Sequence, residues 1–271
     1  MARHLDRRID VTLVDCDPQA VHELRVAAAR LAAVLDGFAG APVAGMEVLR
    51  DNLRWLRHRS SAARDWDALL QDRKLWTTAA HHGEGLKKLQ ALARTERTRA
   101  ADGIAVAVRT RRCLSLQEVL YELAAADREA AAAPTRLQGS HDIRALDQGL
   151  KLVCKQAPPR THFDLERQHK LRKAVKHLRY RCELQHDAAN EAGAAYIGQL
   201  IELQNTLGNV RDAVVGRRLL HRLMKGQDRH LKAAAGDLRH TLAGRRQRLE
   251  WRFLKRWKRF ENTTPFWTPV S

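Results

Sequence analysis

Hydrophobic positions along this chain recur mostly every three or four residues, which is the spacing of one helical face. Alanine, leucine and arginine dominate, glycine and proline are sparse, and no run of alternating β-branched residues is present. Asp17 and Pro18 form a helix-start signal, a capping residue followed by proline, and Gly37 ends the pattern that follows. The apolar face of this first predicted helix carries Val21, Leu24, Ala28, Leu31 and Leu35. We therefore predict an all-α fold.

The same reasoning divides the rest of the chain into further helices separated by glycine and proline signals. Predicted helices cover about 44–60, a segment from near Asp65 to about 81–83, 84–111, 115–133, 164–187, 191–207, 211–225 and 228–260. Breaks are expected at 134–140 and 157–160. Each half of the chain is typical of an antiparallel helical bundle.

An internal repeat connects the two halves. His22-Glu-Leu-Arg25 is followed by Arg64-Asp65, and the same signature recurs 147 residues later, from His169-Lys-Leu-Arg172 to Arg211-Asp212. The two segments overlay without a gap and match at ten of 44 positions, several of them polar residues that a generic amphipathic helix does not need. We interpret this as a duplication. It predicts two pseudo-symmetric bundles, from about 1–135 and about 140–271, joined in a single domain over 1–271.

The net charge narrows the choice of partner. Lys and Arg number 49 against 31 Asp and Glu, which gives +18 at pH 7. Such an excess indicates a polyanionic partner, which is nucleic acid, a lipid surface or a polymeric phosphate. No apolar stretch is long enough to span a bilayer, and the N-terminus lacks the apolar run of a signal peptide, so we expect a cytoplasmic protein with no membrane partner.

Cysteine spacing points away from metal chemistry. The four cysteines show no Cys-x-x-Cys pair, so neither a zinc site nor a disulfide framework is indicated. We expect free, largely buried thiols, no metal site and no cofactor. The cysteines are Cys16, Cys113, Cys154 and Cys182.

A basic stripe in the second half carries the strongest chemical signal. On a helical wheel its members fall within roughly a third of the circumference, away from the apolar stripe of Leu171, Val175 and Leu178. Like charges one turn apart repel each other, so an anion would stabilise this face. Arginine offers phosphate a planar fork, lysine a point charge, and histidine a charge that depends on pH. A simple solvated basic face is the alternative. The stripe contains His169, Arg172, Lys173, Lys176, Arg179 and Tyr180.

The first half repeats part of this pattern. His22 and Arg25 match His169 and Arg172, and the next predicted helix carries arginines at i, i+4 and i+7 that can face the same groove. These arginines are Arg50, Arg54 and Arg57. Asp65 and Asp212 each follow a predicted helix end, and we interpret both as caps or as orienting partners for the arginine before them.

These residues resemble the conserved histidine α-helical domain, or CHAD domain, family. The resemblance covers nearly the whole chain. It rests on His22-Glu-Leu-Arg-Val with Arg30, Arg54-Trp-Leu, Ala63-Arg-Asp-Trp-Asp, His169-Lys-Leu-Arg-Lys-Ala-Val-Lys-His-Leu-Arg-Tyr, Leu207-Gly-Asn-Val-Arg-Asp, Phe253-Leu-Lys-Arg-Trp and Pro265-Phe-Trp.

The resemblance implies a compact helical domain whose two bundles surround a basic central groove or pore that binds inorganic polyphosphate. It also implies association with polyphosphate granules and no enzymatic activity. The residues expected to contact the polymer are His22, Arg25, Arg30, Arg54, Arg57, Arg64, His169, Arg172, Lys173, Lys176, Arg179, Tyr180 and Arg211.

Two other functions stay open at this point. Incidental or primary nucleic-acid binding needs only the charge, and the basic clusters at 245–248 and 255–259 can track phosphates, but no known nucleic-acid motif supports it. A metal-dependent phosphohydrolase acting on polyphosphate can be built from His141-Asp142, His186-Asp187 and His81-His82, although acidic metal ligands do not cluster with them in the sequence.

Overall fold

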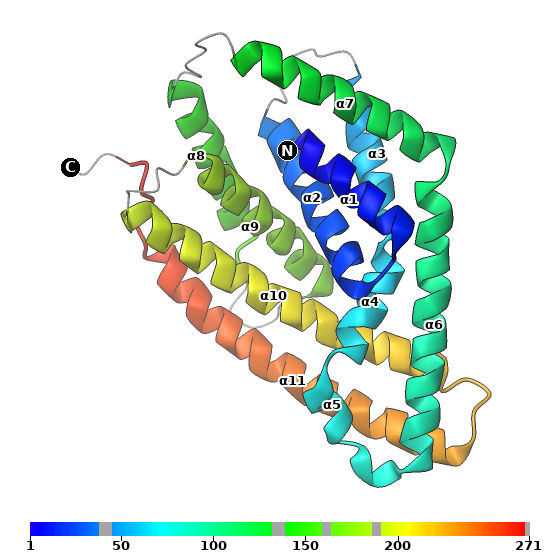
Figure 1. Cartoon of the computed structure of the whole chain (residues 1–271). Helices are drawn as coiled ribbons and strands as arrows, with labels where there is room; N and C mark the ends of the chain where they lie inside the picture. Colours follow the sequence, from blue (N-terminus) through cyan, green and yellow to red (C-terminus); the bar gives the residue numbers. More distant parts are fainter. Residues whose placement is uncertain (38–44, 132–138, 159–163, 186–190, 269–271) are drawn as a thin grey trace. The chain divides into compact units, whose positions relative to one another are not determined.

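The computed structural model describes residues 1–37, 45–131, 139–158, 164–185 and 191–268. Every regular element in these ranges is a helix, as predicted (Figure 1). The elements are α1 (Ala2–Val14), α2 (Pro18–Gly37), α3 (Met46–Arg59), α4 (Ser61–Leu70), α5 (Arg73–Thr77), the 3₁₀ turn η1 (Ala80–His82), α6 (Glu84–Val108), α7 (Arg111–Ala131), α8 (Gly139–Lys155), α9 (Leu165–Gln185), α10 (Glu191–Leu223) and α11 (Arg229–Glu261).

The chain forms two compact units. Unit 1 consists of Met1–Arg136 and Gly216–Thr241, and unit 2 of Leu137–Val215 and Leu242–Ser271. One boundary lies in the predicted break at 134–140. Residues 216–241, however, belong with the N-terminal part of the chain, so α10 and α11 each contribute to both units. The duplication inferred from the sequence stays a prediction.

Aspartate side chains start several of the helices. Asp17 accepts a hydrogen bond from the Ala20 backbone N–H at 2.7 Å, which confirms the predicted cap of α2. Three other aspartates accept from the backbone N–H three residues further on, at 2.8–3.0 Å. Each satisfies one of the donors that a helix N-terminus leaves unpaired. These aspartates are Asp72 of α5, Asp164 of α9 and Asp228 of α11.

The core of unit 1 is built on the face predicted for α2. Its positions Val21, Leu24, Ala28, Leu31 and Leu35 are all buried. Helix α1, which is not among the predicted helices, packs against α2, α6 and α7 and buries its own stripe at the spacing i, i+4 and i+7. That stripe consists of Leu5, Ile9 and Thr12.

The core of unit 2 confirms the apolar stripe predicted for the second half. Leu171, Val175 and Leu178 of α9 are fully buried. They belong to one cluster with side chains of α8, α10 and α11, and aromatic rings close its end near the last described residues. These rings come from Tyr196, Phe260, Phe266 and Trp267.

Two predicted boundaries were wrong. The single helix expected from Asp65 to about 81–83 is divided into α4, α5 and η1. Conversely, the helices expected at 191–207 and 211–225 are one continuous helix, α10, because Gly208 does not interrupt it. In the described part of the chain, no helix is long and apolar enough to cross a membrane.

Candidate functional site

Helix α9 presents the basic stripe of unit 2. Its buried side, with Leu171 and Leu178, fixes the rotation of the helix and leaves the basic side chains on other faces. His169 and Lys173 are exposed, and Arg172, Lys176 and Arg179 are half-buried. The buried parts of Arg172 and Arg179 include their guanidinium Nε atoms.

The Tyr180 ring lies in contact with two cations of this stripe. Its side chain is buried, with 4% of the residue exposed. The Lys176 Nζ atom lies 5.4 Å and the Arg179 Cζ atom 4.6 Å from the centre of its ring, both within cation–π range. Arg179 Nε also lies 3.2 Å from Glu183 Oε1. Tyr180, predicted as a direct contact for the anion, is therefore placed as a platform that orients two cations.

Arg172 of α9 approaches α10 at Gly208. A Cβ atom at Gly208 of α10 would lie 3.9 Å from Arg172 Nε, so Arg172 of α9 lies directly against this glycine. Arg211 follows one turn later on α10, and its Nη1 atom lies 3.3 Å from Asp212 Oδ1. Asp212 is in the interior of α10, so it is an orienting partner for Arg211 and not a helix cap. Gly208 belongs to the motif Leu207-Gly-Asn-Val-Arg-Asp, and a glycine inside a helix is the only sequence signal for its contact with Arg172.

Arg25 of unit 1 has a packing role in the structure. Its Nη1 donates to the Arg57 carbonyl oxygen, and to Ser60 Oγ and Ser61 Oγ, each at 3.1 Å. This guanidinium thus holds α2 against the junction of α3 and α4. Its neighbours on α2, His22 and Arg30, are exposed.

The three arginines predicted on one face of α3 differ in their surroundings. Arg54 is exposed and pairs with Asp51 one turn before it. Arg50 instead donates from Nη2 to the Leu35 carbonyl oxygen at 2.6 Å. This hydrogen bond satisfies one of the carbonyl groups that the C-terminal end of α2 leaves unpaired. Arg57 is half-buried, as is Arg64 of α4. Asp65 lies inside α4 and is not its N-cap, which is Ser60.

Positive charges gather near the start of unit 1. The pKa of His4 on α1 is lowered, first by partial burial and then by the charges of Arg8 and Arg30. Arg8 in turn pairs with Glu23 of α2. Arg30, which the sequence assigned to the anion site, therefore belongs to a local field in which an added cation is disfavoured.

The structure describes only some of the metal ligands that the phosphohydrolase interpretation requires. His186-Asp187 lies outside the described residues, and so do the side chains of His141 and Asp142. His81 and His82 are described, and they contact an acidic side chain, Asp237. No sequence pattern connects Asp237 with the histidines, because it lies 155 positions after His82.

These observations define an all-helical protein with strongly basic helix faces. The CHAD domain model matches residues 1–221, and the chain belongs to the CHAD domain family, as its motifs indicated. That family is linked to inorganic polyphosphate.

Solved structures give the same fold. The crystal structure of the CHAD domain from the plant Ricinus communis is 26% identical, with a TM-score of 0.75 over 95% of this chain and 87% of that one. PptA from Streptomyces chartreusis is 17% identical, with a TM-score of 0.68 over 95% of this chain and 97% of that one, and at this identity the likeness concerns the fold alone. No curated protein matches the sequence.

Proposed function

We propose that this protein binds inorganic polyphosphate without catalysing a reaction on it, and that it acts at polyphosphate granules. The observation that carries the proposal is the basic face of α9. This helix of 21 residues contains seven Lys and Arg against two Glu. Its buried apolar stripe and the Tyr180 platform hold the charges in place, so that little side-chain entropy is lost when an anion binds.

The spacing of these charges suits a linear polyanion. His169, Lys173 and Lys176 follow one another at about one helical turn, a rise of about 5.4 Å per turn. Arg172 and Arg179 add guanidinium groups, which bind phosphate oxygens through paired hydrogen bonds. A linear chain of phosphate groups can bind along this row of basic side chains. Arg211 extends the basic surface onto α10 within the same unit.

The candidate residues of unit 1 are expected to contribute unequally to the affinity for polyphosphate. His22, Arg30 and Arg54 are exposed and can meet a polymer directly. Arg25 already donates three hydrogen bonds within the unit, so its guanidinium has less to offer an added phosphate. We therefore expect unit 2 to contribute most of the affinity.

The first test is a titration of the full-length protein with long-chain polyphosphate and with double-stranded DNA. Both polymers are used at equal phosphate concentration in about 150 mM salt, where diffuse surface pairing is largely screened. We expect tight polyphosphate binding that DNA does not displace. Equal affinity for the two polymers would contradict the proposal and favour a general nucleic-acid-binding surface.

A pair of double variants separates the α9 face from total charge. Arg172→Ala with Lys176→Ala removes one arginine and one lysine from α9, and Lys258→Ala with Arg259→Ala removes the same two types from exposed positions of α11 in the same unit. A hydrogen bond to a charged group contributes about 1.5 to 3 kcal/mol. We therefore expect the α9 variant to lose at least about tenfold in affinity and the control much less. Equal losses would mean that net charge alone binds the polymer.

The absence of catalysis has its own test. Polyphosphate is incubated with the protein and Mg²⁺ or Mn²⁺, and released phosphate is measured against a protein-free control. We expect no release above the control. Release that scales with protein concentration would replace binding by phosphohydrolysis.

A further inference from the structure

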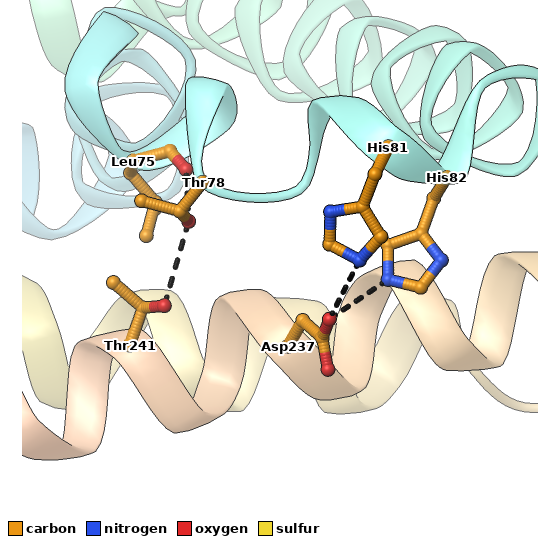
Figure 2. A network of polar contacts seen from close by, with 6 residues as sticks. All are labelled: Leu75, Thr78, His81, His82, Asp237 and Thr241. Carbon is orange, nitrogen blue, oxygen red and sulfur yellow. Dashed lines mark hydrogen bonds and ion pairs between the residues drawn. The ribbon is translucent and has the colours of Figure 1, made fainter.

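Two consecutive histidines and one aspartate converge on the surface of unit 1 (Figure 2). His82 Nε2 lies 2.9 Å and His81 Nε2 lies 3.2 Å from the same atom, Asp237 Oδ2. The histidines are on η1, between α5 and α6, and the aspartate is on α11. All three residues belong to unit 1.

Contacts on both sides fix the η1 segment against α11. On one side the hydroxyl groups of Thr78 and Thr241 are 3.4 Å apart. Figure 2 marks this contact with a dashed line. On the other side Gly85 lies so close to α11 that a Cβ atom there would be 2.7 Å from the His230 carbonyl oxygen. The histidines are therefore positioned over Asp237 by packing and not only by their own contacts with it.

An ion pair next to Gly85 adds to this fixation. Lys88 Nζ lies 3.2 Å from Asp228 Oδ2. The two residues join the first turns of α6 and the start of α11, close to where Gly85 packs. The segment that carries the histidines is thus held at both its ends.

We propose that His81, His82 and Asp237 bind a divalent transition metal, for which Zn²⁺ is the best-matched ion. Bonds of about 2.0 to 2.2 Å in a tetrahedral site place neighbouring ligand atoms about 3.3 Å apart. The observed distances from the imidazole nitrogens to the carboxylate oxygen, 2.9 and 3.2 Å, are close to this requirement. The three ligand atoms all lie within 4.8 Å of one another.

The types of ligand select the class of metal. Imidazole nitrogen favours Zn²⁺, Cu²⁺ and Ni²⁺, whereas Mg²⁺ and Ca²⁺ prefer sites made of oxygen ligands. Two neutral imidazoles and one carboxylate offset one charge of the ion. Three protein ligands also leave a fourth position of a tetrahedral ion for water or an anionic oxygen.

Exposure of the three side chains suits an entry path. His81 is 64% and Asp237 52% exposed, so an ion can reach them from solvent without local unfolding. His82 is only 17% exposed and is the packed member of the site. We therefore expect His82 to be the residue whose loss weakens the metal most.

The test uses the full-length protein, stripped with a chelator that is then removed, and ZnCl₂ in competition with a chromophoric chelator. We expect one Zn²⁺ per chain, little competition from Mg²⁺, and a visible absorption band when Co²⁺ replaces Zn²⁺. His82→Ala and Asp237→Asn should each weaken Zn²⁺ binding by more than about tenfold. His58→Ala, which removes an exposed histidine of α3 in the same unit, should leave it unchanged.

A second measurement keeps the result independent of overall folding. The metal joins η1 to α11, so Zn²⁺ should raise the Tm of the unmodified protein and of His58→Ala but not of His82→Ala. Circular dichroism of the metal-free variants checks that they fold. Zn²⁺ affinity and Tm shifts that survive both site substitutions would overturn the proposal and place the ion among the other histidines.

Discussion

Arg97 Nε donates a hydrogen bond to Asp67 Oδ1 at 2.9 Å, and the Asp67 side chain is 2% exposed. The same guanidinium donates from Nη2 to the Cys16 carbonyl oxygen at 2.6 Å. Arg97 of α6 therefore compensates a buried carboxylate of α4 and at the same time holds the connection between α1 and α2. A buried charge that loses its partner is costly because nothing else solvates it.

We expect Arg97→Ala to destabilise the protein by about 3 kcal/mol. Arg99→Ala is the matched control on the same helix, because Arg99 is exposed and pairs with Glu96 one turn away. The control should change stability by less than about 1 kcal/mol, as exposed pairs do. Urea unfolding followed by circular dichroism measures both. Equal effects would mean that the Asp67 carboxylate does not depend on Arg97.

Arg25→Ala should also reduce stability, by about 1 to 3 kcal/mol, because the Arg57 carbonyl and two serine hydroxyls lose their shared donor. Arg30→Ala on the same helix removes an exposed arginine and should leave the Tm nearly unchanged. Thermal unfolding distinguishes the two. An unchanged Tm for Arg25→Ala would return Arg25 to the direct ligand contacts.

Two glycines of α6 should respond in opposite directions to alanine. A Cβ atom at Gly85 would collide with the backbone of His230, which cannot rotate away as a side chain does, so Gly85→Ala should lower the Tm. Gly103 has open space around it, and Gly103→Ala should raise stability by up to about 1 kcal/mol through helix propensity. Thermal unfolding of both variants checks this, and a stabilised Gly85→Ala would show that α6 and α11 do not pack as described.

The free thiols should react in an order set by burial. Burial raises the pKa of the Cys182 thiol to about 12 and that of Cys113 to about 11. Thiolates are the reactive form, so in the folded protein both should resist alkylation near neutral pH. Cys154, which is exposed, should react first, and intact mass after timed labelling gives the order. Rapid labelling of Cys182 without denaturant would contradict its burial.

The same thiols predict a loss of stability in alkali. Their pKa values are raised in the folded state above an unfolded value of about 8.5, so folding favours their protonated form. Their stabilising contribution is complete below about pH 8.5 and is lost as the pH rises through about 11 to 12. The Tm should therefore fall over this range, and Cys182→Ala should make the fall shallower.

The sequence predicted most of the helices because their signals are local. The start of α2 depends on Asp17 and Pro18, and the buried face of α9 depends on the spacing of Leu171, Val175 and Leu178, so both could be recognised without a structure. Helix α1 was missed because only Leu5 and Ile9 form its apolar stripe, too short a pattern to stand out among charged residues.

The partners of the candidate side chains could not be predicted, because they come from distant parts of the chain. Nothing in the sequence connects Arg25 with the Arg57 carbonyl or His82 with Asp237. The surroundings of Trp251 could not be predicted from the sequence pattern either. A large apolar ring favours a buried position, but Trp251 is 58% exposed and is covered by Lys255, whose Nζ lies 3.6 Å from the ring centre.

Gly208 is an uncharged residue that lies next to Arg172 on the basic surface of unit 2. A Cβ atom there would lie 3.9 Å from Arg172 Nε, an ordinary van der Waals distance, so only a side chain larger than that of alanine would displace Arg172. A bulky residue at this position would move the guanidinium outward while every charge in the sequence stayed the same. The position of the Arg172 guanidinium thus depends on the size of an uncharged neighbour. Two chains with identical charge patterns can therefore differ in their affinity for an anion.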